Sequence, residues 1–143
     1  NWEKRFESAD LLVFGGGDEQ YLTRVMRESG VAEALPELLK SRVYMGISAG
    51  SMVVGKLLPG ELTKELWPEE SFVGNEEGMS MYDFSIFPHF NSEYFAHLRA
   101  PLIESMKDQF PRTVYALDDQ STLKVVGNDI EVVSEGKFLK LDK

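Results

Sequence analysis

A serine between two glycines is the first feature of this sequence that could do chemistry. Ser48 lies in the segment GISAG (46–50), directly after the strand-like run VYM (43–45) and before a helix-like stretch. A G-x-S-x-G pattern between a strand and a helix is typical of a nucleophile elbow, a sharp turn that holds a serine hydroxyl at the edge of a sheet. Because this hydroxyl is hardly ionised at neutral pH, it needs a base within hydrogen-bond reach.

Two histidines could supply that base. His89 follows the strand-like run 85–87 and a proline, so we expect it at the end of a strand. His97 lies in a helix-like stretch among aromatic and apolar residues, which favours an ordinary structural role. His89 is therefore the better candidate for the base.

An acid is needed to orient the imidazole, and several carboxylates are candidates. Asp118 and Asp119 follow the apolar run 114–117. Adjacent strand residues point to opposite sides, so at most one of the two can face His89. A solvated acidic turn is an equally good interpretation of the pair. Other acids in the segment 56–83 are not excluded by their spacing, and they include Asp83, Glu61 and Glu65.

Backbone N–H groups could stabilise an oxyanion beside the serine. The elbow supplies the N–H of Ala49, and the turn GGG (15–17) can supply another from Gly17, which lies next to a helix start. A dinucleotide-binding turn is excluded there, because Gln20 stands where a glycine is needed and Asp18 with Glu19 would repel a pyrophosphate. Neither a metal-binding spacing nor a phosphate-binding loop is present, so we expect no metal and no cofactor.

Apolar runs that alternate with helical periods predict the elements that hold these residues. We expect short strands at 11–14 and 43–45, and helices at 19–29, 32–41 and from about 49. The wholly apolar run 11–14 is typical of a strand that is buried on both faces in a parallel sheet. Pro36 would then have to lie in a first helical turn. The alternation predicts an α/β fold with a mostly parallel sheet flanked by helices, in which sites form beyond the carboxyl ends of the strands.

The second half of the chain has a different pattern. A strand is expected at 85–87 and a helix at 100–109, whereas residues 55–78 are expected to form loops with short elements. Short apolar runs separated by turn residues predict antiparallel strands at 114–117, 123–126, 130–133 and 138–141.

Composition limits the class of protein and its partners. The 143 residues suffice for a single domain, 1–143, and the 43% hydrophobic and 27% charged residues are those of a globular protein. A net charge of −9 without a basic cluster argues against nucleic-acid and anionic-membrane partners. The sequence has no cysteine, no signal peptide and no apolar run of membrane-spanning length, so we expect a cytoplasmic location.

Three segments in the same order resemble the peptidase E and cyanophycinase family of serine peptidases: LLVFGGGDEQYL (11–22), YMGISAGSMV (44–53) and FPHFN (87–91). The resemblance covers about residues 10–126. It implies a flavodoxin-like fold similar to that of class I glutamine amidotransferases, with serine in place of their cysteine.

The resemblance also implies roles for single residues. By position, Ser48 matches the family's nucleophile and His89 its base, while Gly17 and Ala49 match the oxyanion donors. One family position for the acid falls on Asp119. Another falls near Thr63, in a loop that matches poorly, and the resemblance therefore favours Asp119.

The implied activity is hydrolysis of small peptides. The family includes enzymes that act on aspartyl dipeptides and on cyanophycin, which suggests acidic substrates. An acidic side chain would need a cation near the site, for which Arg99 and Lys56 are candidates. The alternative is a non-catalytic relative that binds a small molecule or a partner and keeps the elbow geometry.

Family members carry several tens of residues before the glycine turn, and these form a βαβ portion of the same sheet. We expect the 143 residues to lack that portion, either because they are a fragment of a longer protein or because another chain covers the gap. We therefore expect the strand at 11–14 to have an uncovered apolar face, and the chain alone to be poorly soluble or to form a homo-oligomer.

Overall fold

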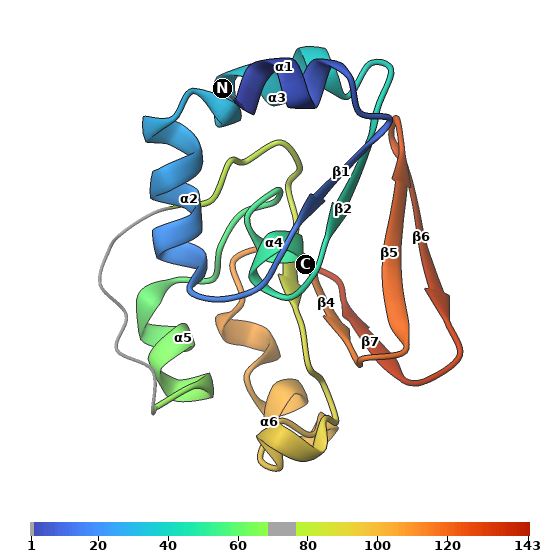
Figure 1. Cartoon of the computed structure of the whole chain (residues 1–143). Helices are drawn as coiled ribbons and strands as arrows, with labels where there is room; N and C mark the ends of the chain where they lie inside the picture. Colours follow the sequence, from blue (N-terminus) through green and yellow to red (C-terminus); the bar gives the residue numbers. More distant parts are fainter. Residues whose placement is uncertain (1, 69–76) are drawn as a thin grey trace.

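The computed structural model describes residues 2–68 and 77–143 of the chain (Figure 1). In the first half, strands β1 (Leu11–Phe14) and β2 (Val43–Gly46) pair in parallel, with Leu12 opposite Tyr44. Five helices belong to this half: α1 (Trp2–Glu7), α2 (Glu19–Glu28), α3 (Val31–Leu38), α4 (Ala49–Met52) and α5 (Gly60–Leu66). None of the helices described is long and apolar enough to cross a membrane.

The second half contains both parallel and antiparallel pairs. β3 (Ser85–Phe87) runs parallel to β4 (Val114–Leu117), which pairs antiparallel with β7 (Phe138–Leu141). β5 (Ser121–Val126) and β6 (Asp129–Ser134) form an antiparallel hairpin beside them (Figure 1). Helix α6 (Ala100–Ser105) lies between two single 3₁₀ turns, Glu93–Phe95 and Lys107–Gln109. The chain therefore has an α/β fold, and the strands predicted at its C-terminal end are confirmed.

The parallel pairs are arranged around the short helix α4. Among the described strands, β1–β2 and β3–β4–β7 form separate hydrogen-bonded ladders, and α4 contacts β1, β2 and β3. The carboxyl ends of β2 and β3 thus both lie near α4. This brings the segments that follow these two strands to the same region of the molecule.

Local signals explain both ends of α2, whereas no side-chain hydrogen bond caps the amino ends of α3, α4, α5 and α6. The Asp18 side chain accepts a hydrogen bond from the Tyr21 N–H at 2.7 Å, which caps α2, and Gly30 follows this helix with a φ of 81°. Pro36 lies beyond the first turn of α3, contrary to the expectation, and the helix ends two residues later. Helix α5 forms within a segment where only short elements were expected.

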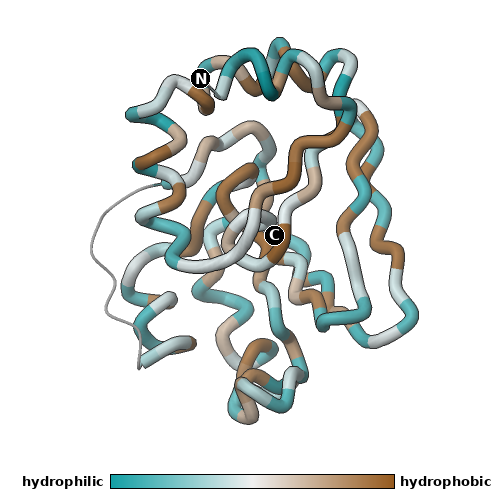
Figure 2. Tube along the Cα trace, viewed as in Figure 1, coloured by the Kyte–Doolittle hydropathy of each residue, from teal (hydrophilic) through white to brown (hydrophobic). Residues whose placement is uncertain are grey.

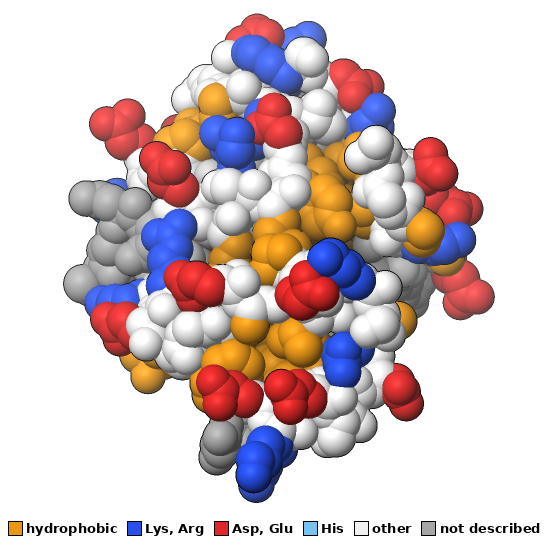
Figure 3. Space-filling model, turned by 90° about the horizontal axis from the view of Figure 1, so that it is seen from above, with side chains coloured by type: hydrophobic (Ala, Val, Ile, Leu, Met, Phe, Trp, Pro, Cys, Tyr) orange, Lys and Arg blue, Asp and Glu red, His pale blue; other side chains and the backbone are white. Residues whose placement is uncertain are grey.

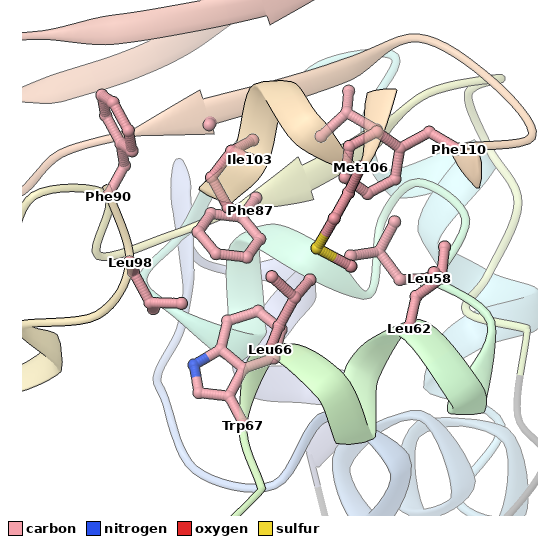
Figure 4. Close-up of a cluster of buried hydrophobic side chains, with 12 residues drawn as sticks. Leu58, Leu62, Leu66, Trp67, Phe87, Phe90, Leu98, Ile103, Met106 and Phe110 are labelled. Carbon is pink, nitrogen blue, oxygen red and sulfur yellow. The ribbon is translucent and has the colours of Figure 1, made fainter. Parts of the chain in front are cut away.

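Three clusters of buried side chains form the core. The largest lies between α5, α6 and one face of β3–β4, where the Trp67 and Phe87 rings stack with centroids 4.7 Å apart (Figure 4). A second cluster joins β1 to helices α1 to α4, and a third lies under the β5–β6 hairpin. Both faces of β3 and β4 are therefore covered, as their uninterrupted burial requires.

The β1–β2 pair is covered on one face only. Leu12 is buried, but Val13 is 54% exposed and Val43 is 62% exposed, and Leu11 and Met45 lie on the same open face. Figure 2 shows β1 as a hydrophobic segment, and in Figure 3 hydrophobic side chains gather in the middle of one face among charges of both signs. The prediction that β1 is buried on both faces is therefore wrong, whereas an uncovered apolar face is present.

We expect the 143-residue chain to self-associate through this open face, because burying exposed apolar side chains is favourable. Val13→Lys combined with Met45→Glu places two opposite charges at paired positions on the face and should shift sedimentation-velocity profiles toward the monomer. Tyr94→Lys changes a 92% exposed aromatic elsewhere and should leave the profile unchanged. A monomeric unmodified chain with a cooperative thermal transition would contradict this expectation.

Candidate active site

Ser48 occupies a strained turn between β2 and α4. Its φ of 55° and ψ of −121° are rare for a residue with a side chain, and the strand ends two residues before it. Such backbone conformations persist only where the surrounding structure enforces them. The turn therefore has the geometry that the G-x-S-x-G pattern predicts for an elbow.

The two glycines of the motif are required by close backbone contacts. A Cβ on Gly46 would lie 2.6 Å from Ser51 Cα, and a Cβ on Gly50 would lie 2.8 Å from the carbonyl oxygen of Gly15 and even closer to that of Phe14. The N–H of Gly50 also donates a hydrogen bond to the Gly15 carbonyl at 3.0 Å. Glycine at position 46 lets the start of α4 lie against the end of β2, and glycine at position 50 lets the elbow lie against the end of β1.

Two side chains brace the elbow from either side, and neither was singled out from the sequence. The Tyr44 hydroxyl donates to the Gly50 carbonyl at 2.5 Å, and the Ser51 hydroxyl donates to the Ser48 carbonyl at 2.6 Å. Burial raises the pKa of the Tyr44 phenol well above its ordinary value, so the group remains a neutral donor. A tyrosine two residues before the motif glycine gives no recognisable signal in the sequence.

His89 follows β3 and contacts the serine. Its Nε2 atom lies 2.9 Å from Ser48 Oγ, and its backbone adopts a φ of 61°. The next residue, Phe90, is buried, and its N–H donates to the Leu117 carbonyl at 3.0 Å. The segment after β3 is thereby tied to the end of β4, which brings the imidazole beside the carboxylates that follow that strand.

Asp119 is the carboxylate that faces the imidazole. His89 Nδ1 lies 2.8 Å from Asp119 Oδ1, whereas the Asp118 carboxylate points to the N–H groups of Gln120 and Lys137. Both residues lie in the turn beyond the end of β4, and only one of the two acids faces His89. Because an ionised carboxylate can only accept, Nδ1 of His89 carries the hydrogen and Nε2 is left free to accept from the Ser48 hydroxyl.

The other candidate acids and the second histidine lie elsewhere. Asp83 pairs with Lys56 at 2.8 Å, and Thr63 is buried in α5 with its hydroxyl donating to backbone carbonyls. Glu61 and Glu65 are exposed on α5. Part of the segment 56–83, residues 69–76, lies outside the described residues. His97 Nε2 lies 2.7 Å from the Leu66 carbonyl, which agrees with the structural role expected for it.

The glycine turn lies against the serine. Gly16 is the glycine that packs on it, since a Cβ at this position would be 3.1 Å from Ser48 Cβ. Gly17 comes next, with a φ of 120° and open space where a Cβ would be. Ala49 begins α4, where a backbone N–H has no acceptor within the helix. The oxyanion roles predicted for Gly17 and Ala49 remain predictions.

A hydroxyl, an imidazole and a carboxylate thus form one hydrogen-bonded chain beyond the ends of three strands of an α/β fold. The comparison with known proteins identifies the family. Residues 2–133 match the model of peptidase family S51, and the chain belongs to that family.

Individual relatives are similar over most of the chain. An uncharacterized peptidase of Listeria monocytogenes is 19% identical over 122 residues, which are 85% of this chain and 58% of that protein. A crystal structure of a candidate peptidase E from the same species has a TM-score of 0.69 at 16% identity, over 93% of this chain and 63% of that one. A crystal structure of a peptidase from an acI-B1 actinobacterium has a TM-score of 0.68 at 25% identity, over 97% of this chain and 56% of that one. The chain thus spans about three fifths of the length of these relatives.

Gly50→Ala should lower the free energy of unfolding by about 1–3 kcal/mol, because the new methyl group overlaps the end of β1. Gly60→Ala is the matched control. It changes the first residue of α5, where nothing lies within 4 Å, and we expect no loss of stability. Thermal unfolding of both variants checks this, and equal stability of the two would contradict the close contact.

Proposed function

We propose that this chain carries the catalytic centre of a serine peptidase, with Ser48 as nucleophile, His89 as general base and Asp119 as the acid that orients the imidazole. The observation that supports this most strongly is that the two nitrogens of one ring lie 2.9 Å from a serine oxygen and 2.8 Å from a carboxylate oxygen. This relation between three groups satisfies the requirement for an activated nucleophile.

In the proposed acylation step, Ser48 Oγ attacks the scissile carbonyl carbon while its proton passes to Nε2 of His89. Asp119 accepts the hydrogen bond from Nδ1–H and stabilises the imidazolium that forms. The tetrahedral oxyanion accepts hydrogen bonds from the N–H groups of Gly17 and Ala49. When the C–N bond breaks, the imidazolium returns its proton to the leaving amine, and an acyl-enzyme remains.

In the proposed deacylation step, water takes the place of the amine. His89 removes a proton from the water as its oxygen attacks the acyl carbon, and the same proton returns to Ser48 Oγ when the ester bond breaks. The scaffold for this chemistry is a single domain, 1–143, with a sheet similar to that of class I glutamine amidotransferases.

A fluorophosphonate probe tests the nucleophile directly. The unmodified chain should be labelled, and Ser48→Ala should abolish the labelling because the attacking oxygen is lost. Peptide hydrolysis by Ser48→Ala should fall by roughly 10⁴- to 10⁶-fold. Ser105→Ala removes a hydroxyl that donates to a helix carbonyl and should be labelled like the unmodified chain.

Failure of the unmodified chain to react with the probe would contradict the proposal. That outcome would favour the alternative function, a non-catalytic relative that binds a small molecule or a partner.

The proposed substrate class rests on a cavity whose lining includes Phe90 and Asn91, the two residues that follow His89 in the chain. This cavity of about 500 Å³ is lined by Phe90, Arg99, Lys137 and six other residues. The Arg99 guanidinium is oriented by its Nη1, which donates to three backbone carbonyls at 3.1–3.2 Å. Within residues 2–68 and 77–143, no carboxylate forms an ion pair with Arg99 or Lys137. Lys137 interacts electrostatically with the Asp118 carboxylate, so Arg99 is the basic residue of this lining that favours an anionic substrate group, as an aspartyl peptide would supply.

Lys56 does not support the same role. Its ammonium group pairs with Asp83, which precedes the amino end of β3, whereas His89 follows the carboxyl end of that strand. Of the two cations considered from the sequence, Arg99 is therefore the one we propose for substrate recognition.

Arg99→Gln should lower kcat/KM for Asp-X dipeptides by about 10- to 100-fold, the usual loss when a charged hydrogen bond is removed. Asn-X dipeptides, which have the same shape without the charge, should lose less than about threefold. Lys56→Gln is the control and should leave both classes unchanged. Equal losses for the acidic and the neutral peptides would contradict recognition of charge by Arg99.

A further inference from the structure

Asp118, the carboxylate of the pair that does not face His89, connects two turns of the chain. Asp118 Oδ1 accepts hydrogen bonds from the Gln120 N–H at 3.0 Å and from the Ser121 hydroxyl at 2.6 Å. Its Oδ2 accepts from the Lys137 N–H, and the N–H of Asp118 donates to the Lys137 carbonyl at 3.2 Å. One side chain thus links the turn between β4 and β5 to the turn between β6 and β7.

The second turn is shaped to receive this carboxylate. A Cβ on Gly136 would overlap Asp118 Oδ2 and lie 2.7 Å from its Cγ, so the backbone can approach the carboxylate only without a side chain. The Ser134 hydroxyl accepts from the Gly136 N–H at 3.0 Å and lies 2.7 Å from the Ser121 hydroxyl. We call this set of residues, Asp118, Ser121, Ser134, Gly136 and Lys137, the clasp.

The clasp adjoins both the proposed catalytic acid and the proposed substrate cavity. Asp119 is the next residue along the chain, and its carboxylate is 55% exposed, so its direction depends on the turn that carries it. Gly136 and Lys137 line the cavity that also contains Arg99. A displacement of the clasp would therefore move the acid and the cavity wall together.

We infer that Asp118 is a positioning residue, which holds Asp119 on His89 and fixes the Gly136–Lys137 wall of the cavity through the clasp. Its effect on catalysis rests on the proposed function, but its effect on the geometry of His89 does not. Partial burial raises the pKa of Asp118, but the hydrogen bonds from Ser121, Lys137 and Gln120 together lower it below the ordinary value. The carboxylate is therefore ionised, and an ionised carboxylate is the stronger acceptor.

Two variants disturb the clasp from opposite sides. Asp118→Asn keeps the size of the side chain but replaces one oxygen by an NH₂ group, which must face an N–H donor. Gly136→Ala leaves Asp118 in the chain and displaces its carboxylate by steric overlap. Asp129→Asn is the matched control, because this exposed acid lies at the opposite end of the β5–β6 hairpin. Thermal unfolding shows which variants remain folded, and only these are used in the two measurements below.

The first measurement is the proton resonance of His89 Nδ1–H, which does not require catalysis. We expect a low-field signal from a slowly exchanging proton in the unmodified chain and in Asp129→Asn. The signal should be lost in both clasp variants, because Asp119 no longer holds the ring. The chain has only two histidines, so His97→Gln assigns the resonance. Absence of this signal from the unmodified chain, or its survival in both variants, would overturn the inference.

The second measurement is the rate of fluorophosphonate labelling. Each clasp variant should be labelled roughly tenfold more slowly than the unmodified chain. In an Asp119→Ala background, Asp118→Asn should change the rate by less than about twofold, because the residue acts through Asp119. If the rate losses of Asp118→Asn and Asp119→Ala multiply in the double variant, Asp118 acts independently of Asp119. Its role would then be merely structural, which would overturn the inference. Failure of the unmodified chain to react contradicts the proposed function alone, since the resonance of His89 still decides the role of Asp118.

Discussion

The close approach of the β2–α4 bend to the end of β1 is the constraint on which the rest of the structure depends. Backbone meets backbone at Gly50, where a Cβ would overlap the Phe14 carbonyl and where the N–H donates to the Gly15 carbonyl, while Gly46 lets α4 lie against the end of β2. The strained conformation of Ser48 exists because these contacts leave the chain no other path. The backbone of Ser48 is thus fixed by contacts with its neighbours, and its hydroxyl lies within hydrogen-bond distance of His89 Nε2.

The remaining groups reach the serine because strand ends converge. His89 follows β3 and Asp119 follows β4, and the hydrogen bond from Phe90 to Leu117 joins these two ends. Each group comes from a different strand, so the site is accurate only if the strands keep their register. Buried side chains on both faces of β3–β4 maintain that register.

Much of this arrangement could be predicted from the sequence, because the relevant signals are local. Apolar runs predicted the strands, and the G-x-S-x-G spacing predicted the bend at Ser48. Asp118 and Asp119 point to different partners in the turn after β4. Helix α5 and the helical position of Pro36 were not predictable in this way. Both depend on packing that only the folded chain supplies, and propensity is a weak guide where packing decides.

Other features depend on residues far apart in the chain. The clasp needs Asp118 and Gly136 together, and the brace on the elbow needs Tyr44 to reach over the bend. Neither pair has a characteristic spacing. The uncovered face of β1–β2 was expected from the resemblance, whereas the pattern of apolar residues alone pointed to burial on both faces.

Tyr44 and Asp118 lose their hydrogen bonds at opposite extremes of pH. The phenol of Tyr44, with its raised pKa, contributes stability that is present below the ordinary phenol pKa and is lost only as strong alkali ionises the folded protein. The Asp118 carboxylate, with its lowered pKa, contributes stability that is present above the ordinary carboxyl pKa and is lost as falling pH protonates it. Acid therefore weakens the hydrogen bonds of Asp118 but leaves the hydrogen bond of Tyr44 intact. Strong alkali weakens the hydrogen bond of Tyr44 but leaves those of Asp118 intact.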